Sequence, residues 1–132
     1  MADTSLIAAA VAARSHAYAP YSRFLVGAAV KDELGKIHAG CNVENAAYPE
    51  GTCAEAGAIA AMIMGGGKRI TEAAVVGAGD ALVTPCGGCR QKLREFGGSD
   101  LVIHVCDERG LIKRSFTLGE LLPSSFGPDN LA

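Results

Sequence analysis

Two short stretches decide how this sequence folds and what it can bind: "EGTCAEAG" at residues 50–57 and "TPCGGCRQ" at residues 84–91. Each places cysteine at the predicted start of a helix. The first stretch puts Glu55 two residues after Cys53, and the second is a Pro-Cys-x-x-Cys pattern. Unpaired N–H groups and the helix dipole favour negative charge at a helix start, so we expect these thiols to ionise more readily than ordinary ones.

The spacing of these cysteines is suited to a metal ion. Cys86 and Cys89 are three residues apart, so they share one helical face, and Cys53 supplies a third thiolate if the two helices lie side by side. Three thiolates suit Zn²⁺, and three protein ligands leave the fourth position for water, as in catalytic zinc sites. Glu55 is near enough to move a proton of that water without being a ligand.

Other readings of the cysteines stay open at this point. A lone CxxC is also typical of a redox pair, or of a structural zinc site with Cys41, Cys106 or a histidine as fourth ligand. Cys41 and Cys106 lie in apolar runs, so we expect small buried residues there. His16, His38 and His104 lack ligand spacing and are interpreted as surface or core residues.

The rest of the sequence alternates helical and strand patterns. Asp3 or Thr4 can cap the first helix, and Thr52 can cap the second. The order of these patterns predicts a mixed five-stranded sheet with helices packed on it. We expect helices over 4–18, 53–64 and 86–96, a helical turn at 117–123, and strands over 25–31, 37–43, 70–79, 101–106 and 111–116.

Composition excludes several classes of protein. The 132 residues favour one domain spanning 1–132, and 49% hydrophobic with 20% charged residues indicates a globular chain. The net charge of −2 and the absence of a basic run argue against nucleic acid, and no apolar run reaches the roughly 20 residues of a membrane span. No positively charged segment precedes the N-terminal apolar run, so no export signal is expected. The odd number of cysteines then favours thiols or metal ligands over disulfides.

Four stretches carry a resemblance to a known family: "YSRFLVGAAV", "GCNVENAAYPEGTCAE", "PCGGCRQ" and "LLPSSF". Over nearly its whole length the chain resembles the small homotetrameric cytidine deaminases of the zinc-dependent deaminase superfamily. The resemblance implies a three-layer α/β/α cytidine-deaminase-like fold. It also implies zinc-dependent hydrolytic deamination of cytidine and 2′-deoxycytidine to uridine and ammonia, in cytoplasmic pyrimidine salvage.

The same resemblance implies roles for particular residues. One zinc ion per chain would be bound by Cys53, Cys86 and Cys89, with Glu55 as the catalytic proton shuttle. The implied substrate contacts are Phe24, Asn42, Val43, Glu44, Ala46, Tyr48, Ala54 and Phe126.

Within this set, Asn42 and Glu44 would hydrogen-bond the ribose 3′-hydroxyl from one strand face. Phe24 would pack on the pyrimidine, and the backbone of Ala54 would meet the base. Tyr48, with Ala46, and Phe126 would reach a neighbouring subunit's site, which implies a homotetramer with shared active sites.

One position departs from the family pattern. Many relatives carry arginine directly after the catalytic glutamate, whereas this chain has Ala56. Zn²⁺ with three thiolates has a formal charge of −1, so a counter-charge is missing. We expect Arg90, together with the helix dipoles, to compensate in part.

Three alternative functions stay open at this point. A deaminase with the same zinc core could act on blasticidin S or a modified nucleoside. Polynucleotide editing is disfavoured because no basic stripe is present. A non-catalytic binding module stabilised by zinc would leave Glu55 without a role.

Overall fold

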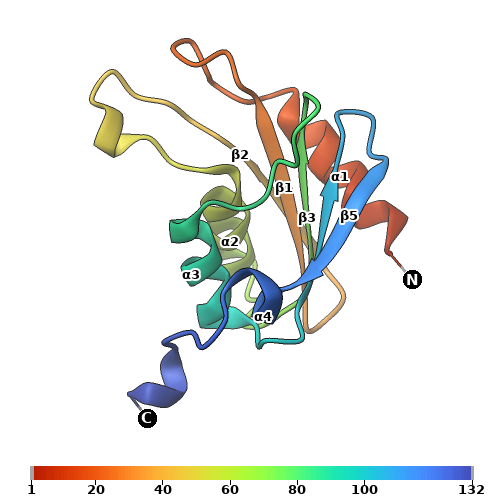
Figure 1. Cartoon of the computed structure of the whole chain (residues 1–132), viewed down its shortest axis with the longest axis vertical. Coiled ribbons are helices and arrows are strands. Elements are labelled where there is room, and N and C mark those ends of the chain that lie inside the picture. Colours follow the sequence, from red (N-terminus) through yellow and green to blue (C-terminus); the bar gives the residue numbers. More distant parts are fainter. Residues whose placement is uncertain (1, 132) are drawn as a thin grey trace.

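A computed structural model describes residues 2–131 and contains the mixed sheet that the sequence predicts (Figure 1). The strands are β1 Val26–Asp32, β2 Ile37–Cys41, β3 Ile70–Gly77, β4 Val102–Cys106 and β5 Ile112–Thr117. β3 and β4 pair in parallel, and all other neighbouring strands pair antiparallel, in the order β2-β1-β3-β4-β5. No helix among these residues is long and apolar enough to cross a membrane.

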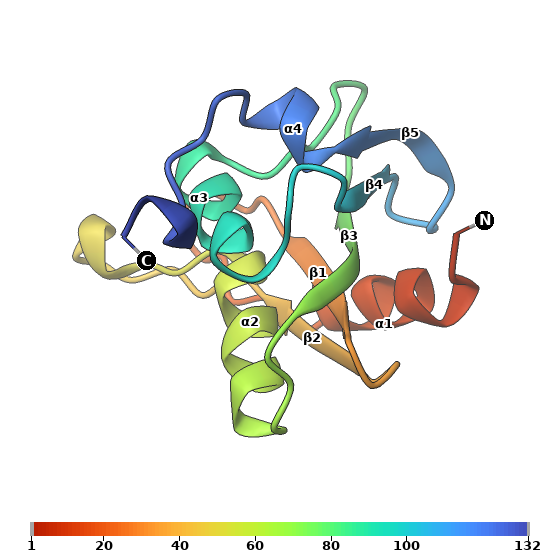
Figure 2. The same ribbon diagram turned by 90° about the horizontal axis from the view of Figure 1, so that it is seen from below.

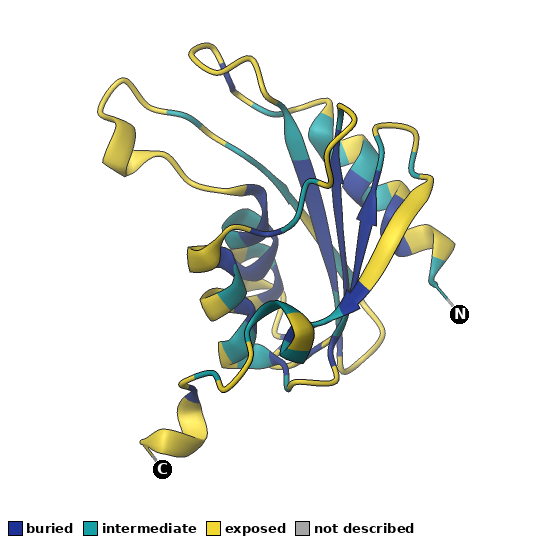
Figure 3. Cartoon of the chain, viewed as in Figure 1, coloured by how far each residue is buried: buried dark blue, intermediate teal, exposed yellow. Residues whose placement is uncertain are grey.

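Helices cover both faces of the sheet, which confirms the three-layer α/β/α architecture (Figures 1 and 2). α1 (Thr4–Arg14) lies on one face, and α2 (Ala54–Met64), α3 (Gly87–Phe96) and α4 (Leu118–Leu121) lie on the other. Alternate side chains of β3 enter the two cores: Ala74 and Val76 pack with α1, and Val75 packs with α2 and α3. A strand buried on both faces needs such a continuous apolar run, and Figure 3 shows this buried centre.

The topology brings several segments to one end of the sheet. α2 leads into β3, and α3 connects β3 to the parallel β4, so both helices run opposite to β3. Both therefore begin near its carboxyl end. β1 begins and β2 ends there as well, because both of the sheet pairings of β1 are antiparallel. This edge is where open α/β sheets bind ligands.

Helix boundaries differ from prediction in two places. Asp3 caps α1 as expected, but the helix ends at Arg14 rather than at 18. The chain turns away because the Tyr18 N–H donates to the Asn42 carbonyl at 2.9 Å, forming a bridge with the end of β2. The residue that caps α2 is Cys53, not Thr52, so that expectation was wrong. Two short 3₁₀ helices, Tyr48–Glu50 and Pro128–Asn130, were not predicted.

Two of the histidines bond to carboxylates. His38 Nε2 lies 2.8 Å from Asp32 Oδ2. His104 is buried, with Nε2 2.7 Å from Glu72 Oε2 and Nδ1 2.7 Å from Ser115 Oγ. These pairs give both histidines the structural role that the sequence analysis assigned.

Of the two cysteines expected to be buried, Cys106 is buried. Cys41 is only half-buried, so that expectation was wrong in part. Cys41 is the last residue of β2, an edge strand of the sheet, where less chain surrounds it.

A close backbone contact sets the position of α2 on β2. A Cβ at Gly40 would lie 2.3 Å from the Ala58 nitrogen and 2.6 Å from the Ala54 carbonyl oxygen. Glycine is therefore required for the helix to approach the strand this closely. Gly57, on the helix side of the same contact, has more room, since its added Cβ would lie 3.4 Å from the nearest atom.

We expect Gly40→Ala to lower the free energy of unfolding by about 3 kcal/mol, because a new methyl group would meet helix backbone that cannot move locally. Gly57→Ala is the matched control. It should leave the free energy of unfolding unchanged or raise it, because alanine is about 1 kcal/mol more favourable than glycine in a helix interior. Denaturant titration of both variants measures this difference, and equal losses would contradict the proposed contact.

Candidate active site

Three thiols meet where α2 and α3 begin. Cys53 and Cys86 are the residues that directly precede these helices, and Cys89 lies in the first turn of α3. Their sulfur atoms all lie within 4.8 Å of one another, and Cys53 Sγ is 3.8 Å from Cys86 Sγ. Two thiolates on a tetrahedral zinc ion with bonds of about 2.3 Å stand about 3.8 Å apart. The donor set therefore fits zinc in both chemistry and spacing.

The cluster consists of the three cysteines selected from the sequence. Over residues 2–131, it is the one group of three or more histidine, cysteine or acidic side chains close enough to share a metal ion. Cys41, Cys106 and the histidines are not members, so no fourth protein ligand of these types joins it.

The expectation that all three thiols ionise readily was wrong for the protein without metal. Burial raises the pKa of Cys53, and it raises the pKa of Cys89 far above its usual range. Burial also acts to raise the pKa of Cys86, but hydrogen bonds from the Cys89 N–H and from its two neighbouring thiols bring it below the ordinary value. At Cys53 and Cys89, desolvation is the largest influence on the pKa. A coordinated cation reverses this balance by deprotonating the thiols it binds.

Glu55 is a buried acid beside the thiols. It lies in the first turn of α2 and is 5% exposed. Burial raises its pKa, while its own N–H, the Cys89 thiol and the charge of Lys92 act in the opposite direction. A carboxyl group with a raised pKa is suited to both accepting and donating a proton.

A pocket of about 330 Å³ contains this acid and most of the predicted substrate contacts. Cys89 is buried and does not line it, and Ala46 and Phe126 are also absent from its lining. Val26, Val83 and Thr84 also line the pocket, and the sequence did not identify them as site residues. Val83 and Thr84 could have been expected there, because they directly precede Pro85 and the zinc-type cysteine motif. The predicted residues that do line the pocket are Phe24, Asn42, Val43, Glu44, Tyr48, Cys53, Ala54, Glu55 and Cys86.

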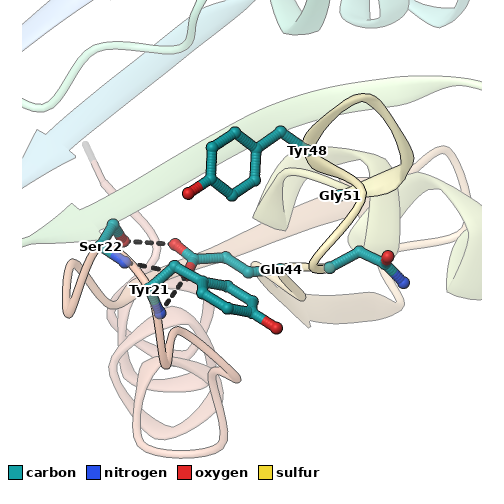
Figure 4. Close-up of a pocket in the computed structure, with 6 residues that line it drawn as sticks. Tyr21, Ser22, Glu44, Tyr48 and Gly51 are labelled. Carbon is teal, nitrogen blue, oxygen red and sulfur yellow. Dashed lines mark hydrogen bonds between the residues drawn. The ribbon is translucent and has the colours of Figure 1, made fainter.

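Asn42 and Glu44 hold one wall of this pocket in place. The Asn42 side chain accepts from the Val26 N–H at 2.9 Å and donates to the Phe24 carbonyl at 2.8 Å. The Glu44 carboxylate accepts from the backbone N–H groups of Tyr21 and Ser22, each at 3.0 Å, and from the Ser22 hydroxyl (Figure 4). The Ser22 hydroxyl is the main cause that keeps the pKa of Glu44 below its usual range.

A second hollow of about 370 Å³ adjoins the pocket and shares Glu44, Tyr48 and Gly51 with it (Figure 4). Tyr21 and Tyr48 pack edge to face across it, with ring centroids 6.0 Å apart. None of the thiols lines this hollow. Cys53, Cys86 and Glu55 line only the smaller of the two spaces.

The Arg90 side chain is hydrogen-bonded to the loop before Cys86 and to the end of α4. Its guanidinium donates to the Pro85 carbonyl at 2.7 Å, the Leu121 carbonyl at 2.8 Å and the Thr84 hydroxyl at 3.2 Å. Within residues 2–131, none of its hydrogen bonds reaches a sulfur atom. Arg90 therefore fixes the loop that presents Cys86.

The fold and the site together define an α/β protein with a zinc-type thiolate centre and a buried acid beside it. Residues 1–105 match the family described as "Cytidine and deoxycytidylate deaminase zinc-binding region". The chain belongs to this family.

Relatives in the family match nearly the whole chain. A cytidine deaminase of Mycobacterium tuberculosis is 44% identical over 92% of this chain and 87% of its own. One of Sporosarcina psychrophila is 39% identical over 96% and 93%. A crystal structure of cytidine deaminase from Burkholderia pseudomallei has a TM-score of 0.87 at 42% identity, covering 96% of this chain and all of that one (100%).

We expect one zinc ion per chain by elemental analysis, and we expect Cys86→Ala to lose most of it, because two thiolates hold zinc far more weakly than three. Cys41→Ser and Cys106→Ser are the controls and should retain the metal. Loss of zinc from either serine variant, with retention in Cys86→Ala, would show that the ligand assignment is wrong.

Proposed function

We propose that this chain is a zinc-dependent cytidine deaminase that hydrolyses cytidine and 2′-deoxycytidine to uridine and ammonia. The observation that carries this proposal is the buried Glu55 beside three thiols in a pocket of about 330 Å³, within the range of small-molecule sites. Relatives named cytidine deaminase over most of the chain support the same reaction. The chain acts as a single domain.

Cys53, Cys86 and Cys89 would hold the zinc ion. When bound, zinc supplies a Lewis acid that makes water a nucleophile near neutral pH. Glu55 accepts a proton from the attacking water and delivers it to N3 of the pyrimidine, and it then carries the proton of the hydroxyl group added at C4 to the departing amine. Its burial keeps bulk water from competing for these protons.

The remaining wall residues bind the nucleoside. Phe24 packs on the base, and Val26 and Val83 give the pocket apolar sides. Asn42 and Glu44 meet the ribose, and their bonds to the 21–26 segment hold them ready for it. This preorganisation lowers the ordering that substrate binding requires.

The charge of the pocket favours an unphosphorylated substrate. Among the described residues that line it, Glu44 and Glu55 are acidic and none is lysine or arginine. A 5′-phosphate or a polynucleotide backbone would find no counter-charge there. Cytidine should therefore be preferred over its 5′-monophosphate. Comparing turnover of cytidine with that of blasticidin S and modified nucleosides tests the alternative deaminase activities.

The proposed reaction is tested by the ultraviolet change of cytidine with zinc-loaded protein. We expect Glu55→Gln to keep its zinc but to lose turnover by about 10²–10⁴-fold or more, because glutamine retains the shape but cannot shuttle a proton. Activity within tenfold of the unmodified protein would remove Glu55 from this role. Full zinc with no turnover of any nucleoside by the unmodified protein would favour the binding module instead.

The active enzyme is, in this proposal, a homotetramer with shared sites in the cytoplasm, serving pyrimidine salvage. Phe126 supports the shared site: its side chain is 58% exposed, and it does not line the pocket of its own chain. The Gln91 side chain donates to its carbonyl at 2.9 Å and fixes the tail on α3. Tyr48 lines the pocket of its own chain, but it is 77% exposed, so its free surface is also available to a neighbour.

We expect Phe126→Ala to raise KM about tenfold with little effect on stability, since an exposed ring contributes little to its own fold but stacks on a neighbour's substrate. Co-expression with Glu55→Gln provides the sharper measurement. Mixed assemblies should recover activity, because some sites then combine an intact Glu55 with an intact Phe126. Absence of recovery in assemblies shown to be mixed, or a fully active monomer in sedimentation, would contradict sharing.

A further inference from the structure

The zinc site concentrates negative charge where α2 and α3 begin. Three thiolates and Zn²⁺ sum to −1, and the carboxyl group of Glu55 is buried beside them. Negative charges that lie close together in partly desolvated surroundings repel one another. This repulsion disfavours the ionised form of each thiol. A nearby cation would therefore stabilise the site.

Arg90 makes no hydrogen bond to a sulfur atom among residues 2–131. Its guanidinium bonds to two carbonyl oxygens and one hydroxyl, at the loop before Cys86 and at the end of α4. These partners use three of the five N–H donors of its guanidinium and fix it against the loop before Cys86 and the end of α4.

Lys92 is the other cation on the first turns of α3, three residues after Cys89. Its side chain turns back toward the helix start, since a Cβ added to Gly88 would lie 3.6 Å from its Nζ. Gly88 stands between the two zinc-ligating cysteines of this helix. Throughout residues 2–131, the Lys92 ammonium makes no ion pair, so its charge is not neutralised by an acid elsewhere.

The groove between α2 and α3 gives this side chain room. It has a volume of about 480 Å³, with Ala56 on one side and Lys92 on the other. The methyl group of Ala56 fills little of it. Glu95 is the one acid among the described residues lining the groove, and it forms no ion pair with Lys92.

We propose that Lys92 is a positioning residue that supplies the counter-charge of the thiolate centre through the groove beside Ala56. The inference rests on the zinc site of the proposed function. The ammonium is exposed, so it acts through space without a direct bond to sulfur, and its effect falls as salt screens it.

The test is the zinc dissociation constant, measured by competition with a chromophoric chelator at low and high salt. K92Q should bind zinc about tenfold more weakly at low ionic strength, and the difference should shrink in high salt. K92R should resemble the unmodified protein. K36Q, which removes an exposed lysine from the β1–β2 turn, is the matched control and should have no effect.

A second arm moves the charge to the facing helix. In the A56R/K92Q double variant, an arginine on α2 enters the same groove, and zinc affinity should recover in part. Unchanged affinity in K92Q, a loss insensitive to salt, or an equal loss in K92R would each overturn the inference. If the unmodified protein binds zinc and one of these results is found, only the Lys92 inference fails and the proposed function stands. If the unmodified protein does not bind zinc, both the Lys92 inference and the proposed function are overturned.

Discussion

The site depends on two helices that begin side by side at the carboxyl end of β3. α2 precedes this strand and α3 follows it, so the chain passes that end twice, more than thirty residues apart in sequence. Three sulfur atoms within 4.8 Å of one another are the consequence. The approach of α2 depends in turn on Gly40, where a side chain would strike helix backbone. A packing constraint between a strand and a helix therefore sets the geometry of a metal centre.

Much of this arrangement could be predicted from local sequence. β-branched runs marked the strands, glycines marked the ends of α2 and α3, and the Cys-x-Glu and Pro-Cys-x-x-Cys patterns marked the site. The features that were missed depend on contacts distant in sequence. The pairing of His104 with Glu72 requires the register of β3 against β4, and the early end of α1 requires the bridge to Val43. Thiol ionisation was misjudged because burial, which the sequence does not display, raises the pKa of Cys53 and Cys89.

Polar residues in and behind the pocket wall hold the surrounding loops in place. Asn42, Glu44 and Arg90 are engaged with backbone and hydroxyl groups of neighbouring loops, so they give the walls one conformation before any substrate arrives. Asn42 and Glu44 retain acceptor capacity beyond these bonds, because each carboxylate or amide oxygen has more than one lone pair. One pair of side chains can thus hold the loop and still meet a ribose hydroxyl. Fixing the wall and binding the sugar are therefore compatible tasks.

The helix starts show what the site costs in stability. Asp3 and Thr117 cap α1 and α4 with side-chain oxygens, whereas Cys53 and Cys86 form no such bond at α2 and α3. An oxygen-bearing cap is worth about 1 kcal/mol to a helix. Cysteine at both caps lacks this stabilisation, and the first N–H groups of the two helices are left without a cap beside the thiols. Those N–H groups and dipoles supply positive potential where negative charge gathers. The two helices that lack an oxygen cap are consequently the ones that can support an anionic metal centre. Metal binding at these two helix starts stabilises the folded chain, which offsets the stability lost with the missing caps.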